Sequence, residues 1–489
     1  VSTTQVAPVP SAAATPIPAK SVAVLPWVNE SGNKDEQYFS DGLSENLITA
    51  LSQFAALKVI SRNSSFQFRD TKDDSATIGR KLGVAHLLEG SVQRIGDEVR
   101  INAELVNAAD GSTLWSQRYD RPYKDLFKLQ DDITAAVANA LKTKLLESHG
   151  AMAQSDRPPS GNLDAYNAYL QGSFYAQRPS KANLHLAIEF FDQAIHLDAR
   201  YALAYAERSR AWTQLAVSFL ELPSEQHQAF ATARDDVSTA LTLDPNLAAP
   251  HDVHGWLLAT TDFDWKGAEA EYRRALQLAP GSEAKLSAIL AALGQPQQAL
   301  DQIQQTLTTN PLCSGCYMSR AVVLMGLGQL DAAAQAMRKA LELAPTGYWK
   351  YIPLTYIEVQ RGHAQAALQT AQQIPPGPWR NVAMAMAQQA SGDHVAADAA
   401  LKTLIDTSAS TAAYQVAEVY ALRQQPDPMF AWLERARANR DPAIGLLLLN
   451  DPPILRYRGD PRFATFCRKV GLPVPGTTPA PIAREASHD

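Results

Sequence analysis

The chain has 489 residues, of which 46% are hydrophobic and 19% are charged, a composition typical of a globular protein with two or three domains. Its net charge of -6 leaves no electrostatic footprint for nucleic acid, and three cysteines cannot form a disulfide framework. No run of about 18 apolar residues occurs, so the sequence predicts no transmembrane helix within the chain.

Residues 1–20 are rich in Pro, Ala, Ser and Thr and show no hydrophobic periodicity. This composition predicts an extended linker. The chain starts at Val1 rather than at methionine, and no signal peptide is visible. We therefore expect a fragment or a processed product, in which a tether following a removed membrane segment is a natural interpretation of the linker.

The next region predicts a small mixed α/β domain with the element order βαβαβββα. Apolar and polar side chains alternate along residues 98–107, which indicates a strand with one buried and one wet face. Ser75 is the expected N-cap of the second helix and Gly83 its expected terminator. The expected strands lie at 21–27, 57–61, 86–95, 98–107 and 112–119, and the expected helices at 41–54, 75–82 and 123–144.

A helical signature recurs after residue 160: Ala, a large apolar residue four positions later, Ala after three more, and Pro after five more. The first three positions lie on one face of a helix, and Pro ends the helix. The copies are Ala233/Val237/Ala240/Pro245, Ala268/Tyr272/Ala275/Pro280, Ala333/Met337/Ala340/Pro345 and a weaker Ala299/Ile303/Thr306/Pro311. Their prolines are 35, 31 and 34 residues apart. A period near 34 predicts a solenoid of stacked helix-turn-helix units, which binds partners rather than catalysing reactions.

The signature is irregular at both ends of the array. An earlier copy has Ala199 where Pro is expected, and the step from Ala199 to Pro245 is 46 residues. This long step predicts about one extra helical segment in that repeat. After residue 350 the signature fades, and Ile374-Pro375-Pro376 breaks its register.

These stretches carry family resemblances. SVAVLPWVNESGN, YFSDGLSENLITALSQF and LKVISRNSSFQF, with the rest of residues 21–146, resemble the TolB amino-terminal-like domain, and the repeats resemble tetratricopeptide (TPR) repeats. YNAYLQGSFY, DFDW and DPPILRYRGDPRFATFCRKVGLP resemble the periplasmic half of CadC-like membrane transcription regulators. The same pair of regions occurs in some membrane-bound cyclases and kinases. The resemblance implies an extracytoplasmic sensory or scaffolding module with no catalytic residues, preceded by an effector and one membrane helix.

The expected architecture is therefore a multidomain chain, α/β followed by all-α, in which a small mixed α/β domain precedes a TPR-type α-solenoid. The expected regions are a linker at 1–20, the α/β domain at 21–146, the helical repeats at 160–440, a C-terminal helical cap at 441–473 and a disordered tail at 474–489.

Cys313 and Cys316 form the short motif that is most able to carry out chemistry. Pro311 ends one repeat, so Cys313 is expected at the start of the next helix, where the helix N-terminus favours a thiolate. One interpretation is a redox-responsive pair. The others are a local structural disulfide or two buried small residues in a repeat turn. A zinc site is disfavoured because zinc requires four ligands, and no metal site is predicted.

Three further side chains are candidates for a binding surface. Trp256 follows Gly255 and is expected to face the inner groove of the array, and Arg210 and Gln214 hold similar places in the preceding repeat. An aromatic ring with polar groups around it could hold a peptide. The alternative is a solvated or domain-facing surface.

The sequence contains no phosphate loop and no nucleophile or metalloprotease motif, so we expect no enzyme activity and no cofactor. The favoured function is the periplasmic sensor of a bacterial single-pass signalling protein tethered to the inner membrane, a CadC-like transcription regulator, with a protein or peptide partner in the repeat groove. Binding would shift an interdomain or oligomeric equilibrium, for which a homodimer is one candidate state. The alternatives are a freestanding periplasmic TPR scaffold, the sensory half of a membrane cyclase or kinase, and a dithiol enzyme that uses the cysteine pair.

Overall fold

The computed structural model divides the chain into two compact units, Val1–Glu147 and Ser148–Asp489, which we treat separately. The residues that the structure describes are 16–55, 57–142, 144–145, 156–220, 222–279, 285–345, 347–409 and 411–476. The predicted linker at 1–20 and tail at 474–489 therefore lie largely outside them, as does Pro280 of the repeat signature.

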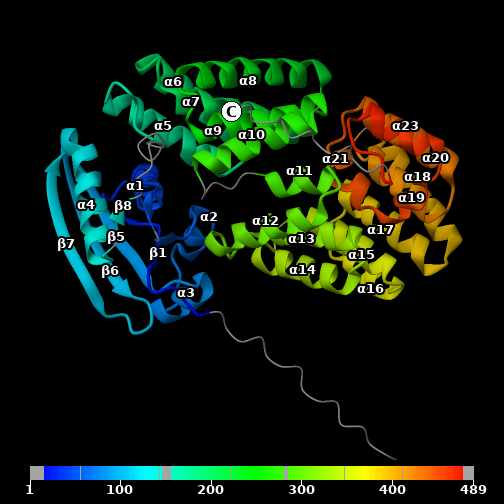
Figure 1. The fold of residues 1–489 in the computed structure, drawn as a ribbon, viewed down its shortest axis with the longest axis horizontal. Helices are drawn as coiled ribbons and strands as arrows, with labels where there is room; N and C mark the ends of the chain where they lie inside the picture. The colour runs from blue at the N-terminus through cyan, green and yellow to red at the C-terminus, as the bar shows by residue number, and fades with distance from the viewer. Residues whose placement is uncertain are drawn as a thin grey trace, which may run out of the picture. The chain divides into compact units, whose positions relative to one another are not determined.

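The first unit is built on a six-stranded sheet with the order β4-β1-β5-β6-β7, in which β2 also pairs with β5 (Figure 1). The pairs that involve β1, β2 and β4 are parallel, whereas β5, β6 and β7 form an antiparallel meander. The strands are β1 (Ser21–Val24), β2 (Val28–Asn29), β3 (Phe54–Ala55), β4 (Lys58–Val59), β5 (His86–Ile95), β6 (Glu98–Asn107), β7 (Thr113–Pro122) and β8 (Lys144–Leu145). The helices are α1 (Gln37–Leu51), α2 (Arg62–Ser65), α3 (Ser75–Leu82) and α4 (Leu126–Ala140).

The sheet has one buried and one wet face, as the alternation in β6 predicts. Every second residue of β6 from Val99 to Leu105 is at most 1% exposed, and the residues between them are partly exposed. Trp27 packs on the buried face over Gly90, where an added Cβ would lie 2.6 Å from the indole ring. A residue without a side chain is therefore needed at Gly90 to seat Trp27.

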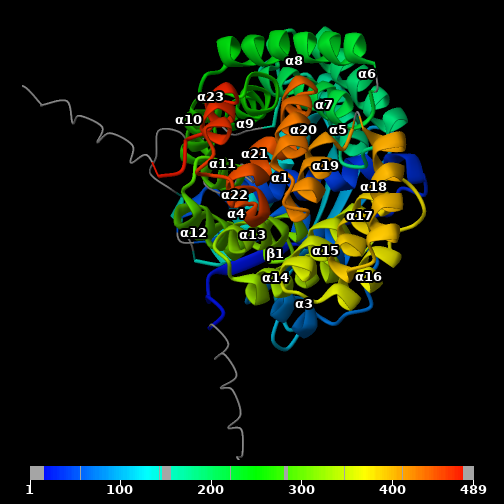
Figure 2. The same cartoon turned by 90° about the vertical axis from the view of Figure 1, so that its right-hand side faces the viewer.

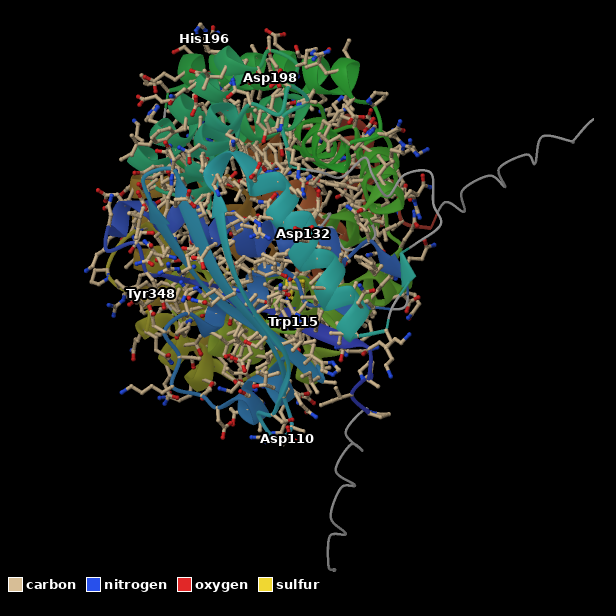
Figure 3. All side chains as sticks on the ribbon, turned by 90° about the vertical axis from the view of Figure 1, so that its left-hand side faces the viewer. Asp110, Trp115, Asp132, His196, Asp198 and Tyr348 are labelled. Carbon is tan, nitrogen blue, oxygen red and sulfur yellow. A yellow bond between two sulfur atoms is a disulfide. The ribbon has the colours of Figure 1, made fainter. Side chains whose placement is uncertain are left out.

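Three local predictions in this unit can be compared with the structure. Gly83 ends α3 with a left-handed φ of 64°, as expected, but the N-cap is Asp74 rather than Ser75, because the Asp74 carboxylate accepts from the Thr77 N–H. The long last helix, expected to reach residue 144, ends at Ala140 because Lys142 adopts a φ of 48°. Asp110 lies in the turn between β6 and β7 (Figure 3), where it accepts from the Ser112 N–H at 2.9 Å.

The second unit is an array of helical hairpins in which each odd-numbered helix packs against the next even-numbered one (Figure 1). The helices are α5 (Leu163–Ala176), α6 (Lys181–Leu197), α7 (Ala202–Ser218), α8 (Pro223–Leu243), α9 (Ala248–Leu257), α10 (Trp265–Leu278), α11 (Leu286–Ala292), α12 (Pro296–Thr309), α13 (Ser314–Gly326), α14 (Leu330–Leu343), α15 (Tyr351–Gln360), α16 (Ala364–Gln372), α17 (Pro378–Ser391), α18 (His394–Ser408), α19 (Ala413–Leu422) and α20 (Pro426–Ala438). A π-helical turn, η5 (Leu258–Asp262), follows α9.

The repeat signature marks the seam within the hairpins that carry it. In the three best copies, both alanines and the large residue between them are at most 2% exposed. The facing helix contributes a small residue, since a Cβ on Gly255 would already approach the Tyr272 ring to 3.2 Å. The predicted TPR-type solenoid is confirmed, because these small residues let paired helices approach closely.

The irregular ends of the array need one correction. The 46-residue step from Ala199 to Pro245 contains two helices, α7 and α8, and not an additional segment. The prediction was wrong because these helices are long, with 17 and 21 residues. After residue 350 the hairpins continue as α15 to α20 although the signature fades, and Ile374-Pro375-Pro376 falls in the connection between α16 and α17.

The C-terminal segment returns to the middle of the array. It consists of α21 (Ala443–Leu447), the 3-10 turn η7 (Leu448–Asn450), α22 (Pro452–Leu455) and α23 (Pro461–Lys469). Figure 2 shows α21 and α22 among α11, α13, α15 and α19. Helix α11 contacts α21 and η7, α13 contacts η7, and α19 contacts α22. We call this the C-terminal closure; its longest-range hydrogen bond runs from the Trp265 indole N–H to the Val470 carbonyl at 2.7 Å.

Buried carboxylates lie inside the closure. Asp451 is fully buried and accepts from the Tyr356 hydroxyl at 2.6 Å and from the Tyr414 hydroxyl at 3.3 Å. Glu418 of α19, which is 3% exposed, shares a hydrogen bond with Asp451. Burial raises the pKa of Asp451 to about 6 and the pKa of Glu418 well above its ordinary value, so the Glu418 carboxyl carries the proton and donates to Asp451.

Candidate functional site

Charged side chains and one tryptophan meet on the first helices of three successive hairpins. We call this group the α7–α9–α11 cluster; it comprises Glu207 and Arg210 of α7, Asp252 and Trp256 of α9, and Lys285 at the start of α11. Figure 2 shows α7, α9 and α11 toward the inside of the array and α8, α10 and α12 outside them. The repeat geometry therefore brings side chains from three repeats to one surface.

Arg210 links α7 to α9. Its Nη1 donates to Asp252 Oδ2 at 2.7 Å, and its Nε donates to Glu207 Oε2 at 3.1 Å. The three side chains are 31%, 16% and 19% exposed, in the order Arg210, Asp252, Glu207. Burial opposes the charge of the guanidinium, but the two carboxylates hold the pKa of Arg210 above its ordinary value. Arg210 is thus a permanent cation with its charge already balanced.

Lys285 is the second cation of the cluster, and it has no such balance. Its Nζ lies 3.6 Å from the centroid of the Trp256 ring, a cation–π contact. Among the described residues, no carboxylate lies within ion-pair distance of this ammonium. Desolvation lowers the pKa of Lys285 to about 8, opposed by the charge of Asp252 and reinforced by that of Arg210. The residue is nevertheless exposed, so a ligand could reach the ammonium.

Asp252 offers a free acceptor in the same cluster. Its Oδ2 binds Arg210, whereas its Oδ1 is buried and has no hydrogen-bond partner in the described structure. Buried acceptors are rarely left unpaired, because the lost hydration is not replaced. A ligand N–H would satisfy this atom once the side chains that cover Oδ1 move aside.

The structure brings together two of the three groove candidates. Arg210 and Trp256 belong to one cluster, joined through Asp252 and Lys285. Gln214 lies one turn further along α7, where its Nε2 donates to the Ser218 hydroxyl at 2.6 Å. Its described hydrogen bond therefore leads away from the cluster.

Sequence reasoning missed the three remaining members of the cluster. Asp252 precedes Trp256 by four residues, and Glu207 precedes Arg210 by three, so both share a helix face with a predicted residue. That spacing could have identified them. Lys285 gave no comparable signal, because the residues around its ammonium come from other repeats.

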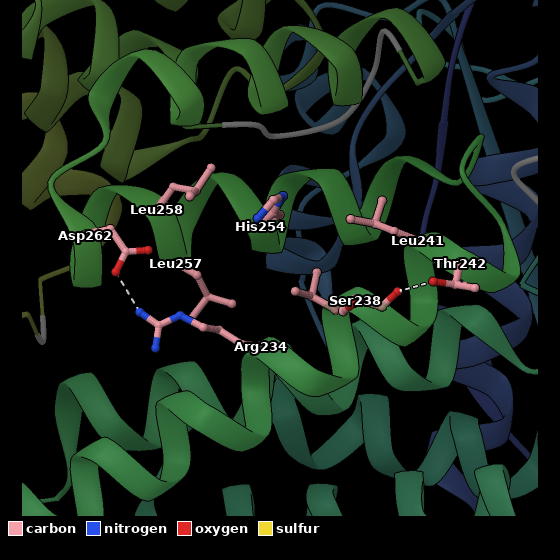
Figure 4. Close-up of a pocket in the computed structure, with 9 residues that line it drawn as sticks. Arg234, Ser238, Leu241, Thr242, His254, Leu257, Leu258 and Asp262 are labelled. Carbon is pink, nitrogen blue, oxygen red and sulfur yellow. Dashed lines mark hydrogen bonds and ion pairs between the residues drawn. The ribbon is translucent and has the colours of Figure 1, made fainter.

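A hollow of about 400 Å³ lies between α8 and α9 (Figure 4). Its floor is apolar, and its polar lining includes Arg234 and Asp262, whose side chains pair at 2.7 Å. Because this ion pair neutralises itself, the hollow lacks a charge that would select a ligand. It is a weaker candidate than the α7–α9–α11 cluster. The lining residues are Arg234, Val237, Ser238, Leu241, Thr242, His254, Leu257, Leu258 and Asp262.

Cys313 and Cys316 lie at the start of α13, where the sequence places them. Their sulfur atoms are bonded at 1.99 Å, and Cys313 is the N-cap residue, with its Sγ accepting from the Cys316 N–H at 3.0 Å. Cys467 is a free, buried thiol whose pKa is raised to about 12 by burial, so it is not a reactive third partner.

No group of three or more His, Cys, Asp or Glu side chains is arranged to hold a metal ion in the part of the chain that the structure describes. Within the same residues, no helix is both long and apolar enough to cross a membrane.

Comparison with known families matches both units of the chain. Residues 18–136 match the model of the second domain of HilA/YgeH-like transcriptional regulators, and residues 314–346 match a tetratricopeptide repeat. The first unit is therefore similar to a regulator domain, and the helical array contains a TPR repeat. Together they indicate a role in signalling or protein interaction.

A relative and two solved structures give further comparisons. A putative adenylate cyclase of Rhizobium meliloti is 38% identical over 213 residues, which are 41% of this chain and 34% of that protein. The chain thus spans about one third of that relative. The type IV pilus biogenesis factor PilW is 18% identical, with a TM-score of 0.34, over 40% of this chain and 92% of its own. A TPR protein from Parabacteroides merdae is 14% identical, with a TM-score of 0.38, over 54% of this chain and 99% of its own.

Proposed function

We propose that this chain is the extracytoplasmic sensor and protein-interaction region of a bacterial single-pass membrane signalling protein, with a TolB-like first unit and a TPR partner-binding array. The observation that carries the proposal is the pairing, in one chain, of a regulator-like domain with TPR repeats. The favoured effector is the transcription-regulating domain of a CadC-like protein. The chain itself acts by binding and not by catalysis.

The sensing surface in this proposal is the α7–α9–α11 cluster. It combines a reachable ammonium on Lys285, an unpaired acceptor on Asp252 and a partly exposed aromatic ring on Trp256. A partner that binds one arrangement of the units better than another would shift their equilibrium by its difference in affinity. The membrane segment would carry that shift to the effector.

Topology fusions to the full-length protein test the location. A reporter that is active only outside the cytoplasm, such as alkaline phosphatase, is joined after Asp489, and a reporter active only inside is joined at the same place in a second fusion. We expect activity from the first and none from the second. The reverse pattern would rule out an extracytoplasmic location.

The similarity to an adenylate cyclase supports a second candidate, the sensory half of a membrane cyclase. Expression of the full-length gene in a strain without its own cyclase distinguishes the candidates. Cyclic AMP in those cells would favour the cyclase. Its absence, together with binding of the full-length protein to its own promoter region, would favour the transcription regulator. A protein that is extracytoplasmic but shows neither activity would favour the freestanding scaffold.

A further inference from the structure

The α7–α9–α11 cluster holds two unsatisfied groups of opposite character, an exposed ammonium and a buried carboxylate oxygen. The Lys285 ammonium rests on Trp256 without a carboxylate partner, and Asp252 Oδ1 has no donor, in each case among the described residues. The other charged groups are already paired, because Arg210 bridges Glu207 and Asp252. Whatever binds here would therefore supply an anion to Lys285 and an N–H group to Asp252.

A peptide segment supplies both groups within one residue or two, through a carboxylate side chain and a backbone N–H. We propose, building on the proposed function above, that the cluster binds an acidic peptide segment whose carboxylate pairs with Lys285 and whose backbone N–H donates to Asp252 Oδ1. The remaining face of Trp256 would contact the apolar part of the segment.

Charge complementarity favours an acidic segment over a basic one. A basic side chain could donate to Asp252 Oδ1, but it would place a third cation beside Lys285 and Arg210. An acidic side chain instead pairs with the Lys285 ammonium. The Lys285 ammonium is partly desolvated, which disfavours its charge. An adjacent carboxylate would replace the lost hydration with an ion pair.

This arrangement has a pH signature. The charged groups that act on the Lys285 ammonium are Asp252 of α9 and Arg210 of α7, and with them the free lysine has a pKa of about 8. Pairing with a carboxylate would return that pKa toward its ordinary value of about 10.4. By linkage, binding then takes up a proton above pH 8, and the affinity falls as the pH rises, by about tenfold at pH 9.

The probes are three fluorescein-labelled pools of acetylated, amidated decapeptides that have random flanks and a fixed central Glu, Gln or Lys. Anisotropy is measured with the intact chain at pH 7 and pH 9 in low salt. We expect the Glu pool to bind at least fivefold more tightly than the Gln pool, and the Lys pool to bind most weakly, since one charge-assisted contact distinguishes them.

Variants at Lys285 test its role. Lys285→Gln should lower the affinity for the Glu pool at pH 7 by about tenfold. Lys285→Arg should keep most of that affinity and abolish its decline between pH 7 and pH 9, because a guanidinium does not deprotonate in this range. The matched control is Lys339→Gln on α14, which removes an equal charge from a lysine already paired with Glu342 at 2.8 Å.

Three results would overturn the proposal: tighter binding of the Lys pool than of the Glu pool, no binding of the Glu pool, or equal losses in Lys285→Gln and Lys339→Gln. The last would mean that only the overall charge matters. None of these results bears on the topology fusions, so failure of the peptide site and failure of the proposed location can be told apart.

Discussion

Trp256 and Trp265 lie nine residues apart, yet the chain itself covers one of them and leaves the other partly exposed. Trp265 is 5% exposed, and the C-terminal closure covers it so tightly that an added Cβ on Gly445 would collide with its ring. Trp256 is partly exposed and carries the Lys285 ammonium on its ring. The array thus fills one stretch of its own inner surface with its own chain and leaves the neighbouring stretch accessible. The contact on Trp265 is intramolecular. A contact on the exposed part of Trp256 would have to come from an external partner.

The two regions also treat their charges differently. Inside the closure, Asp451 and Glu418 are buried together with tyrosine hydroxyls, and one of them keeps its proton. In the α7–α9–α11 cluster, the formal charges of two cations and two carboxylates sum to zero, but only Arg210 is paired with the carboxylates; among the described residues, the Lys285 ammonium has no carboxylate partner and Asp252 Oδ1 has no donor. The polar groups of the closure therefore satisfy each other. The cluster has no net formal charge but keeps one ammonium and one acceptor without a partner among the described residues.

The largest expected difference between the regions is in stability. Trp265→Ala should lower the free energy of unfolding of the second unit by about 3–5 kcal/mol, because it leaves a cavity in a closed core and strands the Val470 carbonyl. Trp256→Ala, the matched control, should cost less than about 1 kcal/mol, because the ring is partly exposed. Urea unfolding followed by circular dichroism measures both. Equal losses would show that the cluster is a structural core like the closure.

The second difference concerns pH. Burial gives Glu418 a folded-state pKa above its unfolded value, so the folded chain holds more protons than the unfolded chain above about pH 4.5. The free energy of unfolding should therefore decrease as the pH rises above about 4.5 and level off once the pH exceeds the folded-state pKa of Glu418. Asp451 contributes with the same sign between its unfolded value and about pH 6.

Glu418→Gln removes the carboxyl that must stay protonated, while its amide can still donate to Asp451. The variant should be more stable than the parent at pH 8 and about equal at pH 4, with a flatter profile between them. Glu342→Gln, at a glutamate that is 67% exposed, is the control and should leave the profile unchanged. Parallel profiles for the parent and Glu418→Gln would place the titrating group elsewhere.

Where the determinants are local, the sequence predicted some element bounds to the residue, although it placed the N-cap of α3 at Ser75 instead of Asp74. The bounds of β5 and β6 follow from alternation and a short turn, and Gly83 ends α3 through its left-handed conformation. The seams of the hairpins that carry the signature follow from alanines at helical spacing. The last helix of the first unit was predicted too long, because no local sequence signal indicates the left-handed backbone conformation of Lys142, which follows it.

Contacts between distant segments could not be predicted in the same way. Repeat register placed Arg210 and Trp256 on the first helices of neighbouring hairpins, but it carried no information about Lys285 from the next repeat. A helical C-terminal cap was expected, yet its docking on Trp265 joins residues 205 positions apart. Single-sequence patterns report periodicity within an element and not the pairing of elements.

The smallest expected effect concerns the cysteine pair, which lies in α13, a helix whose other end meets the closure through Gly326 and Asn450. A disulfide that closes a loop of about four residues should contribute about 2 kcal/mol by restricting the unfolded chain. In Cys313→Ser/Cys316→Ala, the serine hydroxyl replaces the Cys313 sulfur as N-cap and should recover about 1 kcal/mol. Urea unfolding of the variant, and of the parent with dithiothreitol, measures this.

The expected pattern separates a structural pair from a redox-responsive one. If the pair is structural, the double variant and the reduced parent should both lose no more than about 2 kcal/mol, and peptide binding at the α7–α9–α11 cluster should not change. If reduction instead alters that binding, the bond at the start of α13 is coupled to the cluster as well as to the closure. The two regions would then share a switch, and their separation, drawn above from Trp256 and Trp265, would hold only for the oxidised protein.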